Sequence, residues 1–233
     1  MGKGLILLCL IAGGALAADV RSYIPEQAKL YASTLAAVQG VAWASAPEPW
    51  TLGGQVEQES CITLTHKRCW NPRAELKTSR EYGFGFGQIT IAYKADGSER
   101  FNNFKGLKAQ HASLKDWAWE NRYDPKFQLD ALVEMDRTLF TQIRDAATPT
   151  DQLAFMLAGY NGGQGGVLQD RRLCSNTGTC DARRWFGNVE TTSLKTRRVN
   201  PGYGQSAYDI NRGYVRLILQ VRRDKYKVFW EAE

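Results

Sequence analysis

One carboxylate in this chain lies on an apolar stripe, where it is suited to acid–base chemistry. Glu59 is followed by Ser60, and apolar residues precede it at near-helical spacing, at Trp50, Leu52 and Val56. The same spacing places Glu57 on another face. Burial disfavours a charged carboxylate, so a carboxyl group in such a pocket keeps its proton to higher pH and can donate it. The alternative is a buried glutamate that pairs with an arginine.

A glycine-aromatic stretch follows within loop-closing distance, from Gly83 through Phe84, Gly85 and Phe86 to Gly87-Gln88. Alternating glycines allow a backbone to approach a ligand closely, and aromatic rings can stack on sugar faces. The stretch is no phosphate-binding loop, because no Val/Ile-rich strand leads into it and no Lys-Ser/Thr follows. The alternative is a packed tight turn.

Ordinary glycosidases use two carboxylates, so a hydrolytic reaction needs a second acid. Glu81 and Asp96 flank the glycine-aromatic stretch and are the candidates. For Glu81 the alternatives are a pair with Arg80 and a surface position. His66 and His111 have no partner pattern and are left out. The chain has no Gly-x-Ser-x-Gly motif, so an esterase is unsupported.

Helices must position these residues, because strand-rich segments are lacking. Asp124-Pro125 is typical of a helix N-cap followed by a first-turn proline. Thr150 is expected to cap a further helix, which ends at the glycines from 159 to 163. Residues 164 to 206 are expected to be irregular. The sequence predicts a mainly α fold with a small hairpin near residues 87–101 and helices over 24–45, 50–59, 125–144, 150–159 and 207–229.

The N-terminus predicts export. A short positive region precedes an apolar run from Leu5 to Ala17, which ends in the cleavage signal Ala15-Leu16-Ala17. Residues 1–17 are therefore expected to be a signal peptide, and residues 18–233 a single domain in the periplasm or outside the cell. Alternatively, residues 5–17 stay attached as a releasable inner-membrane anchor. Cys9 would then be a thiol-exchange partner.

Four cysteines remain outside the leader, which fits an oxidising compartment. Of the three connectivities, Cys61–Cys69 with Cys174–Cys180 is preferred, since each bond staples a short polar loop. A zinc site fits these spacings poorly, and no metal or cofactor is expected. The net charge of +6 favours an anionic partner. The basic residues are scattered, unlike the dense run of a nucleic-acid-binding arm, so no nucleic-acid partner is expected.

Several short motifs occur in a fixed order. They are Glu59-Ser60, Asn71-Pro72-Arg73-Ala74, Gly85-Phe86-Gly87-Gln88, Ala158-Gly159-Tyr160-Asn161-Gly162-Gly163 and Tyr214-Val215. In this the chain resembles the catalytic domain of lytic transglycosylases, relatives of goose-type lysozymes, and more closely the phage- or plasmid-associated type. The resemblance covers residues 48 to 222.

The resemblance implies a lysozyme-like, two-lobed helical domain. It would cut the β-1,4 bond between N-acetylmuramic acid and N-acetylglucosamine in peptidoglycan, with Glu59 as the acid/base, and form 1,6-anhydromuramic ends. The alternatives are a hydrolytic lysozyme of the endolysin type and a non-catalytic peptidoglycan-binding module. Peptidoglycan glycan strands are the expected partner, the membrane is met only through an uncleaved leader, and a monomer is expected. The implied substrate-binding residues are Ser60, Glu81, Phe86, Gln88, Tyr160, Asn161 and Tyr214.

Other assignments stay open. Asn161 is expected to hold its turn, and Tyr214 is as well explained as a core aromatic. Trp117, Trp119 and Phe84 are sugar platforms or core residues. The chain departs from the family pattern in the Cys61–Cys69 insertion, in Phe86-Gly87 where Leu-Met is usual, and in Gly159 where alanine is usual. Residues 170–206 contain no motif that the family explains.

Overall fold

The computed structural model describes residues 20–231, so the expected leader at residues 1–17 and Cys9 lie outside the described residues. The described chain divides into two compact units. We call residues 20–135 with 220–231 the Glu59 unit, and Asp136–Leu219 the Tyr160 unit. Within residues 20–231, no helix combines the length and apolar character needed to cross a membrane.

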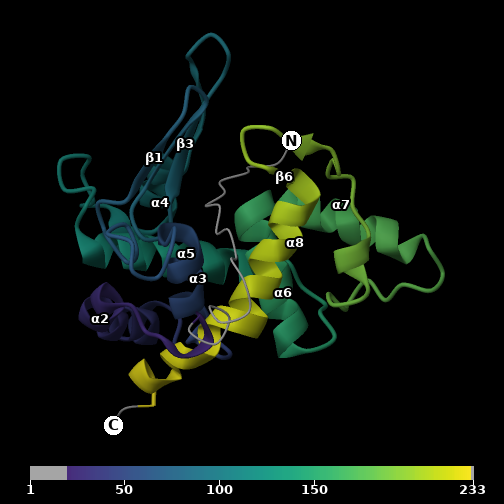
Figure 1. Ribbon diagram of the computed structural model, residues 1–233, viewed down its shortest axis with the longest axis horizontal. Helices are drawn as coiled ribbons and strands as arrows, with labels where there is room; N and C mark the ends of the chain where they lie inside the picture. The colour runs from purple at the N-terminus through teal and green to yellow at the C-terminus, as the bar shows by residue number, and fades with distance from the viewer. Residues whose placement is uncertain (1–19, 232–233) are drawn as a thin grey trace. The chain divides into compact units, whose positions relative to one another are not determined.

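The helices of the Glu59 unit gather around α3 (Thr51–Ser60), of which every residue is buried. Both α2 (Glu26–Ala42) and the 3-10 segment η4 (Arg223–Phe229) pack against it (Figure 1). Two glycines of α3 allow η4 to come close. A Cβ at Gly53 would lie 2.7 Å from the Tyr226 ring, and one at Gly54 would lie 3.0 Å from the Arg223 backbone. The unit also contains α4 (Asn103–Gln110) and η1 (Ala112–Leu114).

An antiparallel sheet of four strands completes the Glu59 unit. Its strands follow chain order as β1 (Glu75–Lys77), β2 (Glu81–Phe84), β3 (Ile89–Tyr93) and β4 (Glu99–Asn102) (Figure 1). The predicted hairpin is confirmed as β3–β4. The strands β1 and β2 were not predicted, because they are short, largely polar and without the apolar alternation of a half-buried strand.

A mainly aromatic core joins this sheet to the helices of the same unit. The Phe84 ring lies 5.9 Å from Trp117, and Phe104 lies 4.7 Å from Trp117. Trp117 and Phe84 are fully buried, so these two residues are core residues. The same cluster contains Ile89, Leu107, Leu114 and Ala131.

The long helix α5 (Pro125–Gln142) begins where the sequence predicts. Asp124 caps it, since its Oδ1 accepts the N–H groups of Lys126 at 2.9 Å and Phe127 at 3.3 Å. The chain passes from the Glu59 unit to the Tyr160 unit within this helix. It returns within the π-helical segment Ile218–Arg222, so the predicted last helix over 207–229 is three successive helical segments.

In the Tyr160 unit, α6 (Pro149–Gly162) packs against α7 (Gln164–Ser175) and α8 (Ala207–Leu217) (Figure 1). The predicted cap at Thr150 is wrong. Thr148 caps α6 instead, because its hydroxyl accepts the Asp151 N–H at 3.1 Å and Pro149 takes the first helical position. The predicted helix end is confirmed at Gly163, which has a φ of 82°.

The prediction of irregular structure over 164–206 is wrong in part. This stretch contains α7, the short 3-10 segment η2 (Val189–Thr191) and a hairpin of β5 (Val199–Asn200) and β6 (Gln205–Ser206). The preferred cysteine pairing is confirmed, with disulfides Cys61–Cys69 and Cys174–Cys180. The mainly α fold with a small antiparallel sheet is confirmed as well.

Candidate active site

Glu59 lies in the last turn of α3 and is 5% exposed. Its neighbour Ser60 links α3 to the end of the Cys61–Cys69 insertion that follows. The Ser60 hydroxyl donates to the Val56 carbonyl at 2.7 Å and accepts the Trp70 N–H at 3.0 Å. The end of the Cys61–Cys69 loop is thereby tied back to the helix that carries Glu59. Ser60 therefore holds the backbone next to the candidate acid.

A second glutamate of α3, Glu57, is buried and paired. Its side chain is completely buried and forms ion pairs with Arg222 and, at 2.6 Å, with Lys225. The Tyr226 hydroxyl also donates to it at 2.6 Å. Burial and the negative charge of Glu57 raise the pKa of Tyr226 well above its usual value, which keeps that hydroxyl protonated as a donor. Trp70 completes the cluster, since its indole N–H donates to the Tyr226 oxygen at 3.0 Å.

This cluster fixes α3 from the side of the C-terminal residues. Burial lowers the pKa of Lys225, although the charge of Glu57 opposes the shift. One carboxylate thus faces two cations and a hydroxyl, and few of its oxygen lone pairs remain for other work. Glu57 therefore holds the helix, and Glu59 remains the candidate for chemistry.

The glycine-aromatic stretch forms a strained turn between β2 and β3. Gly85 has a φ of 75°, and Gln88 has a φ of 45°, which is uncommon for a residue with a side chain. The Gln88 amide donates to the carbonyls of Gly85 at 2.8 Å and Ala74 at 3.2 Å. Its Oε1 is buried and has no hydrogen-bond partner among residues 20–231. A buried acceptor left open in a strained turn is a candidate for binding a ligand hydroxyl or amide.

Gln128 of α5 supports this turn from inside the unit. Its Oε1 accepts the Phe86 N–H at 3.0 Å, and its amide donates to Pro72 O at 2.8 Å. The Phe86 ring is fully buried against Tyr31 at 5.1 Å and Trp70 at 6.0 Å. Phe86 was expected to contact substrate, whereas the structure assigns its ring to the support of the turn.

The two candidates for a second carboxylate differ in their surroundings. Glu81 is half-buried at the start of β2, where it is in register with Ala92 of β3. Asp96 lies in the exposed turn between β3 and β4. Its Oδ1 accepts the hydroxyl of Ser98 at 2.6 Å and the Ser98 N–H at 2.9 Å, and these bonds lower its pKa. Asp96 therefore holds a turn, and Glu81 is the better placed of the two.

His111, set aside in the sequence, has a partner in the structure. Its Nδ1 lies 3.1 Å from Glu134 Oε2, and both side chains are 9% exposed. The pair could not be predicted, because Glu134 lies 23 residues further along the chain and no local spacing links the two.

In the Tyr160 unit the structure brings together two of the predicted residues. The rings of Tyr160 and Tyr214 are nearly parallel, with an interplanar angle of 8° and centroids 6.5 Å apart. Tyr160 is 8% exposed and Tyr214 is 5% exposed. They come from the last turn of α6 and from α8, so the packing of these two helices sets their arrangement.

Asn161 is held by a buried polar network. Asn211 donates from Nδ2 to Asn161 Oδ1 and to Ala158 O, both at 3.0 Å. Arg212 in turn donates to Asn211 Oδ1 at 2.8 Å and to Asp170 Oδ2 at 2.8 Å. A chain of charged and amide groups therefore holds Asn161 at the end of α6.

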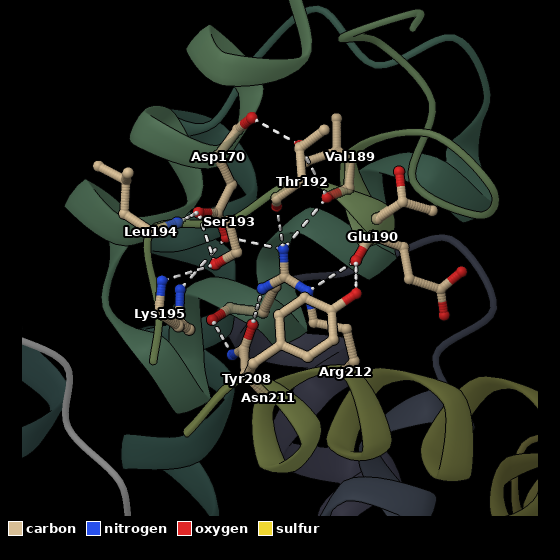
Figure 2. A network of polar contacts seen from close by, with 12 residues as sticks. Asp170, Val189, Glu190, Thr192, Ser193, Leu194, Lys195, Tyr208, Asn211 and Arg212 are labelled. Carbon is tan, nitrogen blue, oxygen red and sulfur yellow. Dashed lines mark hydrogen bonds and ion pairs between the residues drawn. The ribbon is translucent and has the colours of Figure 1, made fainter. Parts of the chain in front are cut away.

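The same Arg212 organises the segment in which the sequence offered no motif. Its guanidinium donates to the carbonyls of Glu190 at 3.0 Å, Val189 at 3.1 Å and Thr192 at 2.6 Å (Figure 2). Asp170 binds the next residues, through the Ser193 hydroxyl at 3.0 Å and the Lys195 ammonium at 3.3 Å. Burial lowers the pKa of Lys195, against the charge of Asp170.

No protein-family model matches this sequence, and no curated protein is detectably similar to it. Among residues 20–231, no group of three or more His, Cys, Asp or Glu side chains is arranged to hold a metal ion.

Proposed function

We propose that this protein cleaves the β-1,4 bond between N-acetylmuramic acid and N-acetylglucosamine in peptidoglycan, with Glu59 as the acid/base. The observation that carries the proposal is the setting of Glu59. It is an almost buried carboxyl group at the end of a helix that Glu57 and Ser60 hold in place. A desolvated carboxyl group on a rigid element is the arrangement that proton donation near neutral pH requires.

In the proposed reaction, protonated Glu59 donates its proton to the glycosidic oxygen, and the bond to the muramic C1 breaks. The ionised Glu59 then takes the proton of the muramic C6 hydroxyl, and the C6 oxygen bonds to C1. The carboxyl group ends as it began, and the products carry a free 4-hydroxyl and a 1,6-anhydro ring. One carboxyl group suffices for this reaction. This agrees with the structural hydrogen bonds that Glu57 and Asp96 accept.

The other residues would bind the glycan strand. The open Oε1 acceptor of Gln88 suits a sugar hydroxyl or an acetamido N–H. Tyr160 and Tyr214 would supply hydroxyl groups and an aromatic face, with Asn161 fixing the backbone of the turn. Membership of the lytic transglycosylases and a lysozyme-like fold belong to the same proposal.

A hydrolytic lysozyme is the second candidate, and half-buried Glu81 is the observation in its favour. Two carboxylates would then flank the scissile bond, and water would take the place of the C6 hydroxyl. A non-catalytic binding module on the same fold is a weaker alternative, since such a module has no need of a desolvated carboxyl group at position 59.

The test is turbidity clearance of purified cell-wall sacculi by the wild type and Glu59→Gln. The variant keeps the shape of the side chain but cannot donate a proton, so we expect clearance to fall by a factor of about 10² to 10⁴. Glu26→Gln, an exposed change on α2, is the matched control and should clear walls as the wild type does. Clearance retained by Glu59→Gln would contradict the proposal. Mass spectrometry then decides the reaction, because 1,6-anhydro ends mean a transglycosylase and reducing ends mean a lysozyme.

The place of action is also part of the proposal. Two disulfides are typical of proteins in an oxidising compartment. We propose that the protein is exported, acts as a monomer in the periplasm or outside the cell, and needs no cofactor. An N-terminal mass measurement on the exported protein tests the leader, since loss of residues 1–17 would rule out a releasable anchor.

A further inference from the structure

A surface of arginine and aromatic side chains on the Glu59 unit has no part in the function proposed above. Its residues come from the start of β1 and the loop before it, from β2, and from the segment that precedes α5. We call it the Trp119 surface. Its residues are Arg73, Glu75, Tyr82, Trp119, Arg122 and Tyr123.

Trp119 is the exposed member of an otherwise buried aromatic group. It is 39% exposed, whereas its ring neighbours Phe84 and Phe104 are buried. The Tyr82 ring lies 5.9 Å from it and carries the aromatic surface towards β2. An indole ring that is fixed on one side and open on the other is a suitable platform for the apolar face of a sugar.

The arginines of this surface lie over rings. The Arg122 guanidinium is 4.5 Å from the Trp119 ring centre and 4.2 Å from that of Tyr123, and Arg73 is 4.8 Å from Tyr123. Within the described chain, Arg122 Nε is buried and has no hydrogen-bond partner. Arg122 Nη1 and Nη2 already donate, each at 2.9 Å, to the Trp119 carbonyl and the Tyr123 hydroxyl, which fixes the guanidinium over the rings. A guanidinium has five N–H donors, so others remain for an acceptor such as a carboxylate.

The carboxylate of the surface, Glu75, accepts hydrogen bonds from hydroxyl groups. Tyr82 and Tyr123 both donate to its Oε1. Burial opposes the ionisation of Glu75, but these two hydrogen bonds and the charge of Arg122 outweigh it and lower the pKa of Glu75. Glu75 thus fixes the two tyrosines, and the cations beside it outnumber it. The surface is rigid, aromatic and positively charged.

We propose that the Trp119 surface binds an acidic amino sugar, with the sugar ring on Trp119 and a carboxylate of its lactyl or peptide substituent against Arg73 and Arg122. This inference rests on the proposed function, because the substrate of that reaction presents both features on one residue. It adds a binding site outside the residues assigned to the reaction and identifies the part of the substrate that the site takes.

The test is co-sedimentation of the full-length protein with purified sacculi and with chitin, an uncharged polymer of N-acetylglucosamine. Glu59→Gln is the background, so that cleavage does not remove the ligand. We expect Trp119→Ala to weaken binding to both polymers about tenfold, through the lost ring contact. Arg73→Gln should weaken binding to sacculi several-fold and leave chitin binding unchanged, because only sacculi carry carboxylates.

Two matched controls lie on the same unit. Tyr23→Ala removes an aromatic ring of similar exposure, 37%. Arg100→Gln removes an arginine that lies over Phe101 at 5.3 Å, a ring that is not part of the Trp119 surface. Both controls should bind like the background protein. Trp119→Phe, which keeps a ring, should recover most of the binding and so separates stacking from misfolding.

Several outcomes would overturn the inference. Trp119→Ala and Arg73→Gln could bind sacculi as tightly as the background, Arg73→Gln could lose chitin binding equally, or single-stranded DNA could compete with sacculi for these residues. In each case, release of cleaved muropeptides by the wild-type protein shows whether the proposed function still stands. The two proposals can therefore fail independently.

Discussion

The Asn211 side chain holds Asn161 by a hydrogen bond of 3.0 Å between Nδ2 and Oδ1, across two helices and 50 residues of sequence. Asn211 is itself oriented by Arg212, whose charge is balanced by buried Asp170. The position of Asn161, next to Tyr160, thus depends on the Arg212–Asp170 ion pair through Asn211. We regard Asn211 as a positioning residue for the end of α6.

Asn211→Asp tests this role. The aspartate keeps the size of the side chain and its bond from Arg212, but it presents an acceptor to Asn161 Oδ1. We expect cell-wall cleavage to fall by about 10- to 100-fold, because a displaced turn misplaces Tyr160. The free energy of unfolding should fall by about 1 to 3 kcal/mol. Asn176→Ala, at the exposed end of α7, is the control. A variant with normal kcat would show that Asn211 is only a packing residue.

Glu57→Gln should destabilise the protein while leaving the proposed acid in place. The change removes the partner of two buried cations, Arg222 and Lys225, and a broken buried ion pair typically costs about 3 to 5 kcal/mol. Urea denaturation measures this loss. Glu59→Gln should instead lower cell-wall clearance by the factor of about 10² to 10⁴ expected for the loss of the acid. Equal midpoints for the wild type and Glu57→Gln would refute the anchoring role of Glu57.

Gly85→Ala should destabilise the turn for two reasons that can be separated. Gly85 has a positive φ, and a Cβ there would clash with the side-chain amide of Gln128. Gly97 has a similar φ of 82° and open space around it. Gly97→Ala should therefore cost about 1 to 2 kcal/mol for the backbone alone. The extra loss in Gly85→Ala, about 1 to 3 kcal/mol, measures the clash. Equal losses for both variants in thermal unfolding would argue against a tight contact.

Asp130→Asn should raise the thermal stability at neutral pH. Burial, helped by the negative charge of Glu134, raises the pKa of Asp130 in the folded protein, against a hydrogen bond from Ser113. The folded state therefore holds this proton more tightly than the unfolded state. The stabilisation by Asp130 is present below its unfolded pKa, and it is lost as pH rises through the folded pKa. The Asp130→Asn variant should thus melt higher than the wild type at pH 7, and the two should melt alike below about pH 3.

The control for this pH dependence is Asp116→Asn, an exposed change between η1 and α5. Its melting temperature should follow the wild type at every pH. A wild type that melts above Asp130→Asn at pH 7 would show that the Asp130 carboxylate is stabilising when charged.

Reduction of the disulfides should lower the stability of both units. Cys61–Cys69 and Cys174–Cys180 close loops with sequence separations of 8 and 6. Loops of this length correspond to about 2 to 3 kcal/mol each in the chain-entropy account. Thermal unfolding with and without dithiothreitol measures the sum, and the variants Cys61→Ser/Cys69→Ser and Cys174→Ser/Cys180→Ser divide it between the units. A melting temperature unaffected by the reductant would contradict the expectation.

The sequence alone determined the features that depend on neighbouring residues. Helical periodicity and cap residues located α2, α3 and α5, with Asp124-Pro125 at a helix start and Gly163 at a helix end. Short spacings predicted the two disulfides. The cap at Thr148 was missed because a second threonine, Thr150, stands two residues further on. Either threonine could cap the same helix, and the sequence does not distinguish them. Local signals therefore predicted helix existence better than helix boundaries.

Only the tertiary structure decided which residues are paired. Glu57 meets Arg222 across 165 residues, and Arg212 meets Asp170 across 42, so no local spacing could reveal either ion pair. The stretch after residue 170 looked irregular because its order comes from a buried arginine on a distant helix. Periodicity placed Glu59 on the apolar stripe of its helix. The contacts that long-range folding brings to Glu57 and Ser60 decided that this helix end is held in place.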